Sequence, residues 1–221
     1  MKTKIFDVLP STNEYAETHD FLEDTAIIAR EQTGGKGTKG RSFSSLKGGV
    51  YLSLVRLIPC KAADSFSVMV ASCMAVVKTL ESYGVKAQIK WANDVFVNGK
   101  KICGILIKNI FEGDYVKKSI TGIGVNVNNE IPSELQSIAI NLKSLIGKVD
   151  TDEFSKKLIE NLYKHYSIDD YRSYNMVLGR RITVIDGEKT YTATASDISP
   201  NGNLVLSDGR ILSHGEVTIR L

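Results

Sequence analysis

Hydrophobic residues recur along the chain with two different periods, and together they predict an α+β protein. Short, almost continuous apolar runs at 25–31 and 50–58 are typical of buried strands. Residues 64–83 repeat their apolar positions with helical spacing, and Gly84 follows where such a helix would end. The apolar stripe of this helix consists of Phe66, Val70, Met74, Val77 and Leu80.

The second half of the chain predicts hairpins, one further helix and a change of character near its end. Asn98-Gly99 separates two strand-like segments and is the strongest short signal of a two-residue hairpin. Residues 101–111 and 115–127 form a second candidate hairpin, and 151–166 have helical spacing. Beyond 177, short apolar segments alternate with Asp-Gly and Asn-Gly turns, as in a small β-barrel. We therefore expect a domain at 1–176 and a barrel domain at 177–221.

Composition places the chain among ordinary globular proteins. It has 221 residues, 43% of them hydrophobic and 24% charged, with a net charge of +3. The basic residues are spread along the chain, which is no signature of nucleic-acid binding. The three cysteines are widely spaced and form no Cys-x-x-Cys pair, so neither a disulfide framework nor a zinc site is indicated. The absence of an apolar leader and of an apolar run of about 20 residues leads us to expect a cytoplasmic location and no membrane association.

A glycine-rich basic loop at 32–45 is the most unusual segment. Its glycines allow close approach of backbone amides to an anion, and its cations suit a phosphate. Gly35, Gly37 and Gly40 satisfy the dinucleotide pattern, and the P-loop pattern fails only at Arg41. Both mechanisms require a helix that begins at the loop, whereas a strand is expected here. A solvated loop without function is the alternative.

Two further polar units become informative only in combination. Lys90-Trp91-Ala92-Asn93-Asp94 precedes the Asn-Gly hairpin, and Gly122-Ile-Gly-Val-Asn126 ends a strand. Taken singly, each is more simply explained as a turn or a strand end. Together with the loop and Lys101, they suit the joining of a carboxylate to ATP, which requires two anions to be neutralised. An Asp and an Asn on neighbouring strands could also hold Mg²⁺.

An ordered set of motifs resembles the biotin–protein ligase family. The set covers almost the whole chain in the family's order. It consists of Ser11-Thr12-Asn13, Gln32 with Gly35-Lys36-Gly37 and Gly40-Arg41, Gly49-Val-Tyr-Leu-Ser53, Lys90–Asp94, Lys101-Ile-Cys-Gly104-Ile-Leu106, Gly122–Asn126 and Gly215-Glu-Val-Thr-Ile-Arg220.

The resemblance implies a mixed β-sheet catalytic domain with helices, similar to class II aminoacyl-tRNA synthetases, followed by an SH3-like β-barrel. It implies formation of biotinyl-5′-adenylate from biotin and ATP with Mg²⁺, then transfer to a lysine of a biotin carboxyl carrier protein. Lys101 would be the catalytic lysine. Biotin would be bound by Ser11, Thr12, Asn13, Gln32, Gly35, Lys36, Gly37, Thr38 and Lys101. ATP and the adenylate would be bound by Lys36, Thr38, Arg41, Lys90, Trp91, Asn93, Asp94 and Asn126, and the metal by Asp94 and Asn126.

The chain departs from the family pattern at several positions. Lys36 and Thr38 stand where arginines are usual, Ala92 replaces a proline, and Lys108 replaces a frequent glutamate. The loss of a charge at Thr38 leads us to expect weaker retention of the adenylate. We also expect the glycine loop to become ordered when biotin binds.

Some family members carry an N-terminal helix-turn-helix domain. Only ten residues precede Ser11, too few for two helices and a turn, so we expect no DNA binding. The resemblance leaves open whether two copies form a homodimer.

There are three alternatives to a biotin ligase, and the nearest shares its fold. A lipoate ligase or lipoyl transferase shares the fold and the lysine chemistry, but the 90–94 block, the 122–126 run and the barrel favour biotin. A nucleic-acid-binding module would place several aromatic residues among the basic ones, whereas only Phe43 lies in the loop. In a non-catalytic biotin sensor, Lys101 and Asp94 would have no role.

Overall fold

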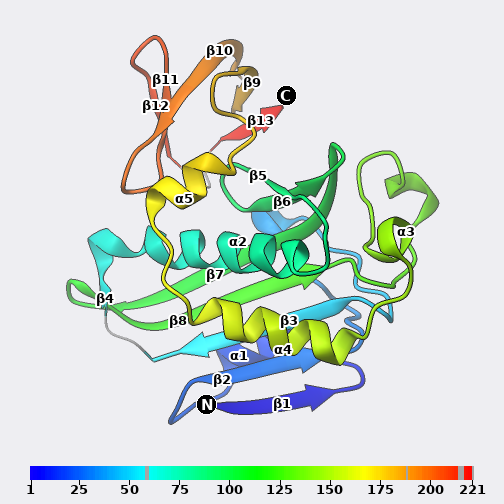
Figure 1. The fold of residues 1–221 in the computed structure, drawn as a ribbon. Coiled ribbons are helices and arrows are strands. Elements are labelled where there is room, and N and C mark those ends of the chain that lie inside the picture. The colour runs from blue at the N-terminus through cyan, green and yellow to red at the C-terminus, as the bar shows by residue number, and fades with distance from the viewer. Residues whose placement is uncertain (58–59, 188, 214–216, 221) are drawn as a thin grey trace.

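The computed structural model describes residues 1–57, 60–187, 189–213 and 217–220. Over these residues the chain forms a large sheet with helices on both faces and a smaller sheet at its C-terminal end (Figure 1). The elements of the larger part are β1 (Lys2–Phe6), α1 (Thr12–Thr18), β2 (Thr25–Ala29), η1 (Thr38–Gly40), β3 (Val50–Arg56), β4 (Cys60–Lys61), η2 (Ala62–Asp64), α2 (Phe66–Glu81), β5 (Gln88–Lys90), β6 (Asp94–Val97), β7 (Lys100–Glu112), β8 (Tyr115–Val125), η3 (Ser133–Leu135), α3 (Lys143–Ile146), α4 (Thr151–Leu162) and α5 (Ile168–Ser173). The C-terminal elements are β9 (Arg181–Asp186), β10 (Lys189–Ile198), β11 (Leu204–Leu206), β12 (Ile211–Leu212) and β13 (Thr218–Arg220).

The large sheet is mixed, as the sequence predicted. Its strand order is β1-β2-β3-β8-β7-β6-β5, and β4 pairs with β8. β1 runs parallel to β2, whereas the remaining neighbours are antiparallel. The predicted α+β class is therefore confirmed.

The two faces of the large sheet are covered by different helices. α2 and α4 pack side by side on one face, and the short α1 lies against β3 and β8 on the other (Figure 1). Apolar residues of α2 and the central strands form the main core, with Met74, Leu80, Leu52 and Ile105 almost fully buried. Because α1 is short, part of its face of the sheet stays uncovered, and the candidate site lies there.

The predicted Asn98-Gly99 hairpin is confirmed by its backbone. Both residues have positive φ, 51° at Asn98 and 75° at Gly99, which is the type I′ geometry that matches strand twist. Val97 therefore pairs directly with Lys100. This turn fixes the register that places Lys101 at the beginning of β7.

Several short elements were not predicted. α3 and α5 have four and six residues, and β4 has two. None is long enough to show a hydrophobic period. The elements with expected ranges, β2, β3, α2, β7, β8 and α4, begin and end within a few residues of them.

The C-terminal sheet packs on the large domain through apolar side chains that share its core and through polar contacts. Its five strands are ordered β12-β11-β10-β9-β13, all antiparallel over the described residues. The indole N–H of Trp91 donates to the Gly202 carbonyl at 2.9 Å. Arg172 of α5 donates to the Ile198 carbonyl and pairs with Asp197 at 3.1 Å. The first strand of the small sheet begins at Arg181, a few residues after the expected domain boundary at 176/177. The boundary itself stays a prediction.

The segment Ala62–Glu81 is long and apolar enough to span a membrane by length and composition, although no such run was expected. In the structure 56% of its most apolar window is buried inside the protein. Its helix α2 packs against α4 and the sheet. These contacts are those of a core helix.

Candidate functional site

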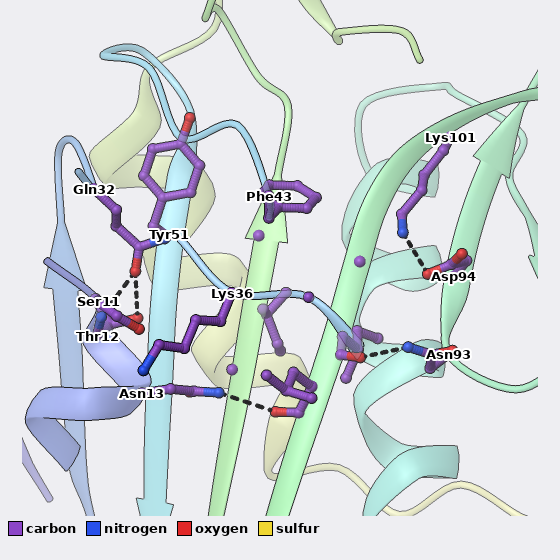
Figure 2. Close-up of a pocket in the computed structure, with 17 residues that line it drawn as sticks. Ser11, Thr12, Asn13, Gln32, Lys36, Phe43, Tyr51, Asn93, Asp94 and Lys101 are labelled. Atoms are coloured by element: carbon purple, nitrogen blue, oxygen red, sulfur yellow. Dashed lines mark hydrogen bonds and ion pairs between the residues drawn. The ribbon is translucent and has the colours of Figure 1, made fainter. Parts of the chain in front are cut away.

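A pocket of about 480 Å³, including its open mouth, lies on the α1 face of the large sheet. Figure 2 shows hydroxyl and amide side chains at one end and Lys101 with Asp94 at the other, with Phe43 between them. The lining residues are Ser11, Thr12, Asn13, Gln32, Lys36, Gly37, Phe43, Tyr51, Asn93, Asp94, Lys101, Gly104, Ile105, Leu106, Gly122, Ile123 and Gly124.

The first end of the pocket begins at the N-terminus of α1. The Ser11 hydroxyl accepts the Glu14 backbone N–H at 3.4 Å and so caps the helix. The Thr12 backbone N–H and hydroxyl both donate to Gln32 Oε1, at 2.8 and 3.1 Å. Gln32 Nε2 donates to the Ser45 hydroxyl at 2.9 Å, which fixes the orientation of the amide.

Ser53 of β3 supports this end from below and was missed as a site residue. Its hydroxyl lies 2.8 Å from Thr12 Oγ1 and 2.6 Å from Asn13 Oδ1, and the residue is fully buried. Asn13 Nδ2 donates to the Leu106 carbonyl at 3.4 Å. Ser53 therefore holds Thr12 and Asn13, two predicted site residues of α1, in place. In the sequence, the one indication of this role is a serine inside an otherwise apolar strand.

We expect Ser53→Ala to lower the free energy of unfolding by about 1–2 kcal/mol, because the buried Asn13 Oδ1 loses the hydroxyl that donates to it. Denaturant unfolding measures this difference. Ser133→Ala is the control, since the Ser133 hydroxyl contacts only Glu134 at an exposed position. An equal loss in the two variants would contradict the supporting role of Ser53.

Glycines form the floor of the pocket. A Cβ at Gly122 would lie 2.7 Å from Asn13 Cγ, and a Cβ at Gly124 would lie 2.6 Å from Phe43 Cε1. Asn13 and the Phe43 ring can therefore lie against the sheet only where side chains are missing. The spacing of the two glycines in the 122–126 run follows from the pleat, which turns alternate residues to the same face.

Lys101 and Asp94 form an ion pair at the other end. Lys101 Nζ lies 2.7 Å from Asp94 Oδ1, with exposed side-chain fractions of 33% and 28%. The Lys101 backbone is held as well, because its N–H donates to Ile138 and its carbonyl accepts from Ile140. Asn93 Nδ2 donates to the Ile105 carbonyl at 2.7 Å, across the start of the same hairpin. A positioned ammonium here can stabilise negative charge that develops in the pocket.

The glycine loop is a closed hairpin whose tip is the η1 turn. The Phe43 N–H donates to the Gly35 carbonyl, and the Gly37 N–H donates to the Arg41 carbonyl. A strand, β3, follows the loop, which bears out the rejection of P-loop and dinucleotide motifs. Lys36 and Gly37 line the pocket, whereas Gly35, Thr38 and Arg41 lie outside its wall.

Neither Lys90 nor Trp91, both expected to bind ATP and the adenylate, lines the pocket. Trp91 is buried, and its indole contacts the C-terminal domain rather than the pocket. Burial lowers the pKa of Lys90; nearby Asp94 counters this, and Lys101, Arg220 and Arg41 lower the pKa further. Lys90 therefore lies within electrostatic reach of Asp94, Lys101 and Arg41, although neither Lys90 nor Arg41 lines the pocket.

The expected pairing of Asp94 and Asn126 on neighbouring strands was also wrong. β7 lies between β6, which begins at Asp94, and β8, which ends just before Asn126. The Val127 N–H donates to Asn129 Oδ1, so Asn129 Nδ2 faces Asn126 and donates to its Oδ1 at 3.0 Å. The amide oxygen of Asn126 is thus already engaged.

Two further departures from the family pattern, Lys108 and Ala92, make contacts in the structure. Lys108 pairs with Glu17 of α1 at 2.7 Å. The Ala92 carbonyl accepts the Tyr171 hydroxyl at 2.7 Å. Of the last motif, Gly215 and Glu216 lie outside the described residues, and Arg220 lies on β13.

Comparison with family models matches both parts of the chain. Residues 5–128 match the biotin/lipoate A/B protein ligase family, and residues 177–220 match the biotin protein ligase C-terminal domain. The second match is to a domain that is named for biotin protein ligases alone.

Relatives and solved structures agree with these matches. The bifunctional ligase/repressor BirA of Bacillus subtilis is 33% identical, with 90% of this chain and 67% of the relative covered. The biotin–[acetyl-CoA-carboxylase] ligase of Mycobacterium tuberculosis is 26% identical, with 89% and 79% covered. The biotin protein ligase from Aquifex aeolicus in complex with biotin and ATP superposes with a TM-score of 0.81 at 26% identity, covering 99% and 98% of the two chains. With its motifs, its fold and both domain matches in agreement, the chain belongs to the biotin protein ligase family.

Proposed function

We propose that this protein activates biotin with ATP to give biotinyl-5′-adenylate and pyrophosphate, and then transfers biotin to a lysine of a biotin carboxyl carrier protein. The observation that carries this proposal is the arrangement of the pocket. Hydroxyl and amide groups at the Thr12 end suit a neutral polar ring, and Lys101 at the other end suits a carboxylate that meets a phosphate.

The biotin ring would lie at the Thr12 end. Thr12, Asn13 and Gln32 offer both donors and acceptors to a ureido group, and Ser11 lies beside them. Tyr51, whose hydroxyl donates to the Leu46 carbonyl at 2.6 Å, and Phe43 would cover the apolar part of the ligand. The valeryl chain would then lie over the glycine floor and direct its carboxylate toward Lys101.

In the first step, a carboxylate oxygen of biotin attacks the α-phosphorus of ATP. A carboxyl–phosphate anhydride bond forms, the bond between the α- and β-phosphates breaks, and pyrophosphate leaves. The Lys101 ammonium would move from Asp94 to the oxygens that share this charge, where a preorganised cation is most effective. Lys36, Arg41 and Lys90 would supply further positive charge near the phosphates.

In the second step, the neutral amine of a carrier lysine attacks the acyl carbon of the adenylate. An amide bond forms, the bond to AMP breaks, and the amine loses a proton. Phe43 and Tyr51, which line the pocket, would limit access of water to the anhydride.

Mg²⁺ is part of the proposal, with Asp94 as its protein ligand. Asp94 lines the pocket with a carboxylate, the ligand type that Mg²⁺ takes together with phosphate oxygens and water. Asn126 fits less well, because its amide oxygen accepts from Asn129 and β7 separates it from Asp94. When bound with ATP, Mg²⁺ would neutralise phosphate charge.

Biotin transfer is the test of the complete function. The protein would be incubated with biotin, ATP, Mg²⁺ and a purified carrier domain, and the carrier analysed by intact mass. We expect one biotinyl group per carrier, and none on a carrier whose acceptor lysine is replaced by arginine. Modification of the carrier by lipoate in place of biotin would show that the protein is a lipoate ligase. Modification by neither would refute the proposal.

We expect Thr38→Arg to slow release of the adenylate by about 10-fold, because a charge-assisted hydrogen bond to phosphate contributes about 1.5–3 kcal/mol. Thr38 begins the η1 turn at the tip of the loop hairpin, next to the pocket. A chase of labelled adenylate with unlabelled biotin measures the release rate. Thr38→Gln is the control of similar length without charge. Equal release from both variants would show that no cation is missing at this position.

A further inference from the structure

The ammonium group of Lys36 is paired with Glu14 and points away from Lys101. Lys36 Nζ lies 2.9 Å from Glu14 Oε2, and the side chains are 60% and 50% exposed. Figure 2 shows Lys36 extended toward α1, near Asn13, while Lys101 lies across the pocket. The loop lysine is thus held at the rim by a carboxylate of α1.

Glu14 can reach Lys36 because of its place in α1. It is the third residue of that helix, and its own backbone N–H is already taken by the Ser11 hydroxyl. In a capping box its carboxylate would turn back to the backbone of Ser11. Here the carboxylate contacts Lys36 instead, so the ion pair links α1 to the glycine loop across the mouth of the pocket.

Each lysine that lines the pocket therefore has its own carboxylate. Lys36 pairs with Glu14, and Lys101 pairs with Asp94. An anionic ligand must compete with these internal anions for the same ammonium groups. Asp94 belongs to the machinery proposed above, whereas Glu14 has no role in that account.

We propose that Glu14 is an affinity-determining residue, an internal anion that occupies Lys36 and weakens the binding of ligands that carry a carboxylate or phosphate. This inference rests on the proposed function only for the identity of the ligand, biotin. Glu14→Gln keeps the size of the side chain, removes the charge and leaves Lys36 free to turn into the pocket. The ion pair is exposed, so the expected gain in affinity is small, about threefold to fivefold.

Glu17 provides a matched control on the same helix. It pairs with Lys108 at 2.7 Å and does not line the pocket. Glu17 also raises the pKa of Lys36, but as the last and smallest cause after Glu14. Glu17→Gln therefore removes the same charge from α1 without releasing Lys36.

The first measurement needs no ligand. Acetylation of the free protein by an activated acetyl ester, followed by peptide mass spectrometry, reports how fast each lysine reacts. Glu14 raises the pKa of Lys36, so Glu14→Gln is expected to speed acetylation of Lys36 and not of Lys108. Glu17→Gln is expected to leave the Lys36 rate almost unchanged, because Glu17 is the smallest cause of its shift. An unchanged Lys36 rate in Glu14→Gln would show that the ion pair does not hold Lys36 in solution.

The second measurement compares two ligands by calorimetry: biotin, and its alcohol analogue, in which a hydroxyl replaces the carboxylate. Glu14→Gln should bind biotin about threefold to fivefold more tightly and the alcohol unchanged, and this gain should shrink as salt is raised. In a Lys36→Gln background the gain should vanish. Weaker biotin binding, or an equal change for both ligands, would overturn the proposal. A native protein that binds neither ligand would refute the proposed function, while the acetylation rates would still decide the role of Glu14.

Discussion

Lys101→Ala is expected to slow adenylate formation by about 10³-fold, the effect of removing one preorganised charge donor from a site of this kind. The ammonium of Lys101 lies at the end of the pocket where carboxylate and phosphate would meet, and Asp94 and the Ile138–Ile140 segment hold it there. The variant should have a lower kcat, with a smaller change in the KM for biotin. The reason is that the negative charge stabilised by the Lys101 ammonium develops during the reaction.

Lys100→Ala is the matched control for this prediction. Lys100 is the adjacent residue of β7, and its ammonium donates to the Gln136 carbonyl, away from the pocket. Single-turnover formation of the adenylate should be within about twofold of the native rate in this variant, as is usual for surface changes. Equal losses in the two variants would remove the special role of Lys101, and an unfolding curve for each would exclude misfolding as the cause.

Gly122→Ala is expected to weaken biotin binding by about 10- to 100-fold, because overpacking a rigid site costs about 1–3 kcal/mol. The added methyl group would collide with the amide of Asn13. Asn13 has little room to yield, since Ser53 and the Leu106 carbonyl hold its two polar atoms. The pocket would therefore lose its shape at the end proposed for the ureido ring.

Gly34→Ala tests whether this effect is specific. A Cβ at Gly34 would meet the Pro10 carbonyl oxygen at 3.4 Å, an ordinary contact, and Gly34 lies in the glycine loop. Calorimetric titration with biotin should give a native affinity for this variant. A native affinity for Gly122→Ala as well would contradict the assignment of this end of the pocket to biotin.

Most of the fold could be predicted because its long elements have clear periods and its turns have specific chemistry. The stripe on α2 and the apolar runs of β2 and β3 indicate buried elements. Asn98-Gly99 sets a hairpin through positive φ angles that few residue pairs adopt easily. α3 and α5 escaped prediction because their stability comes from packing and caps rather than from a repeat, as the Ser167–Asp170 capping box shows for α5.

The candidate site was predicted as a set of motifs, but the sequence could not show which way each side chain points. Thr12, Gln32, Asn93 and Lys101 do line one pocket. Trp91 shares a motif with Asn93, yet its ring is buried against Gly202 because the chain turns between β5 and β6. A shared motif therefore does not imply a shared surface.

The missed residues give at most a weak signal of their own. Ser53 and Tyr51 lie inside an apolar strand, where a residue with a single hydroxyl is most simply interpreted as part of the core. Phe43 acts through its place over Gly124, a contact between segments about eighty residues apart that only the folded chain reveals. A single sequence contains little information about long-range contacts of this kind.

Exchange of label between pyrophosphate and ATP in the presence of biotin and Mg²⁺ tests the central claim most directly, with lipoate and Lys101→Ala measured beside it. The pocket predicts exchange with biotin, none with lipoate, and an exchange rate about 10³-fold lower without Lys101. Exchange supported by lipoate but not by biotin, or biotin-dependent exchange that survives loss of Lys101, would contradict it.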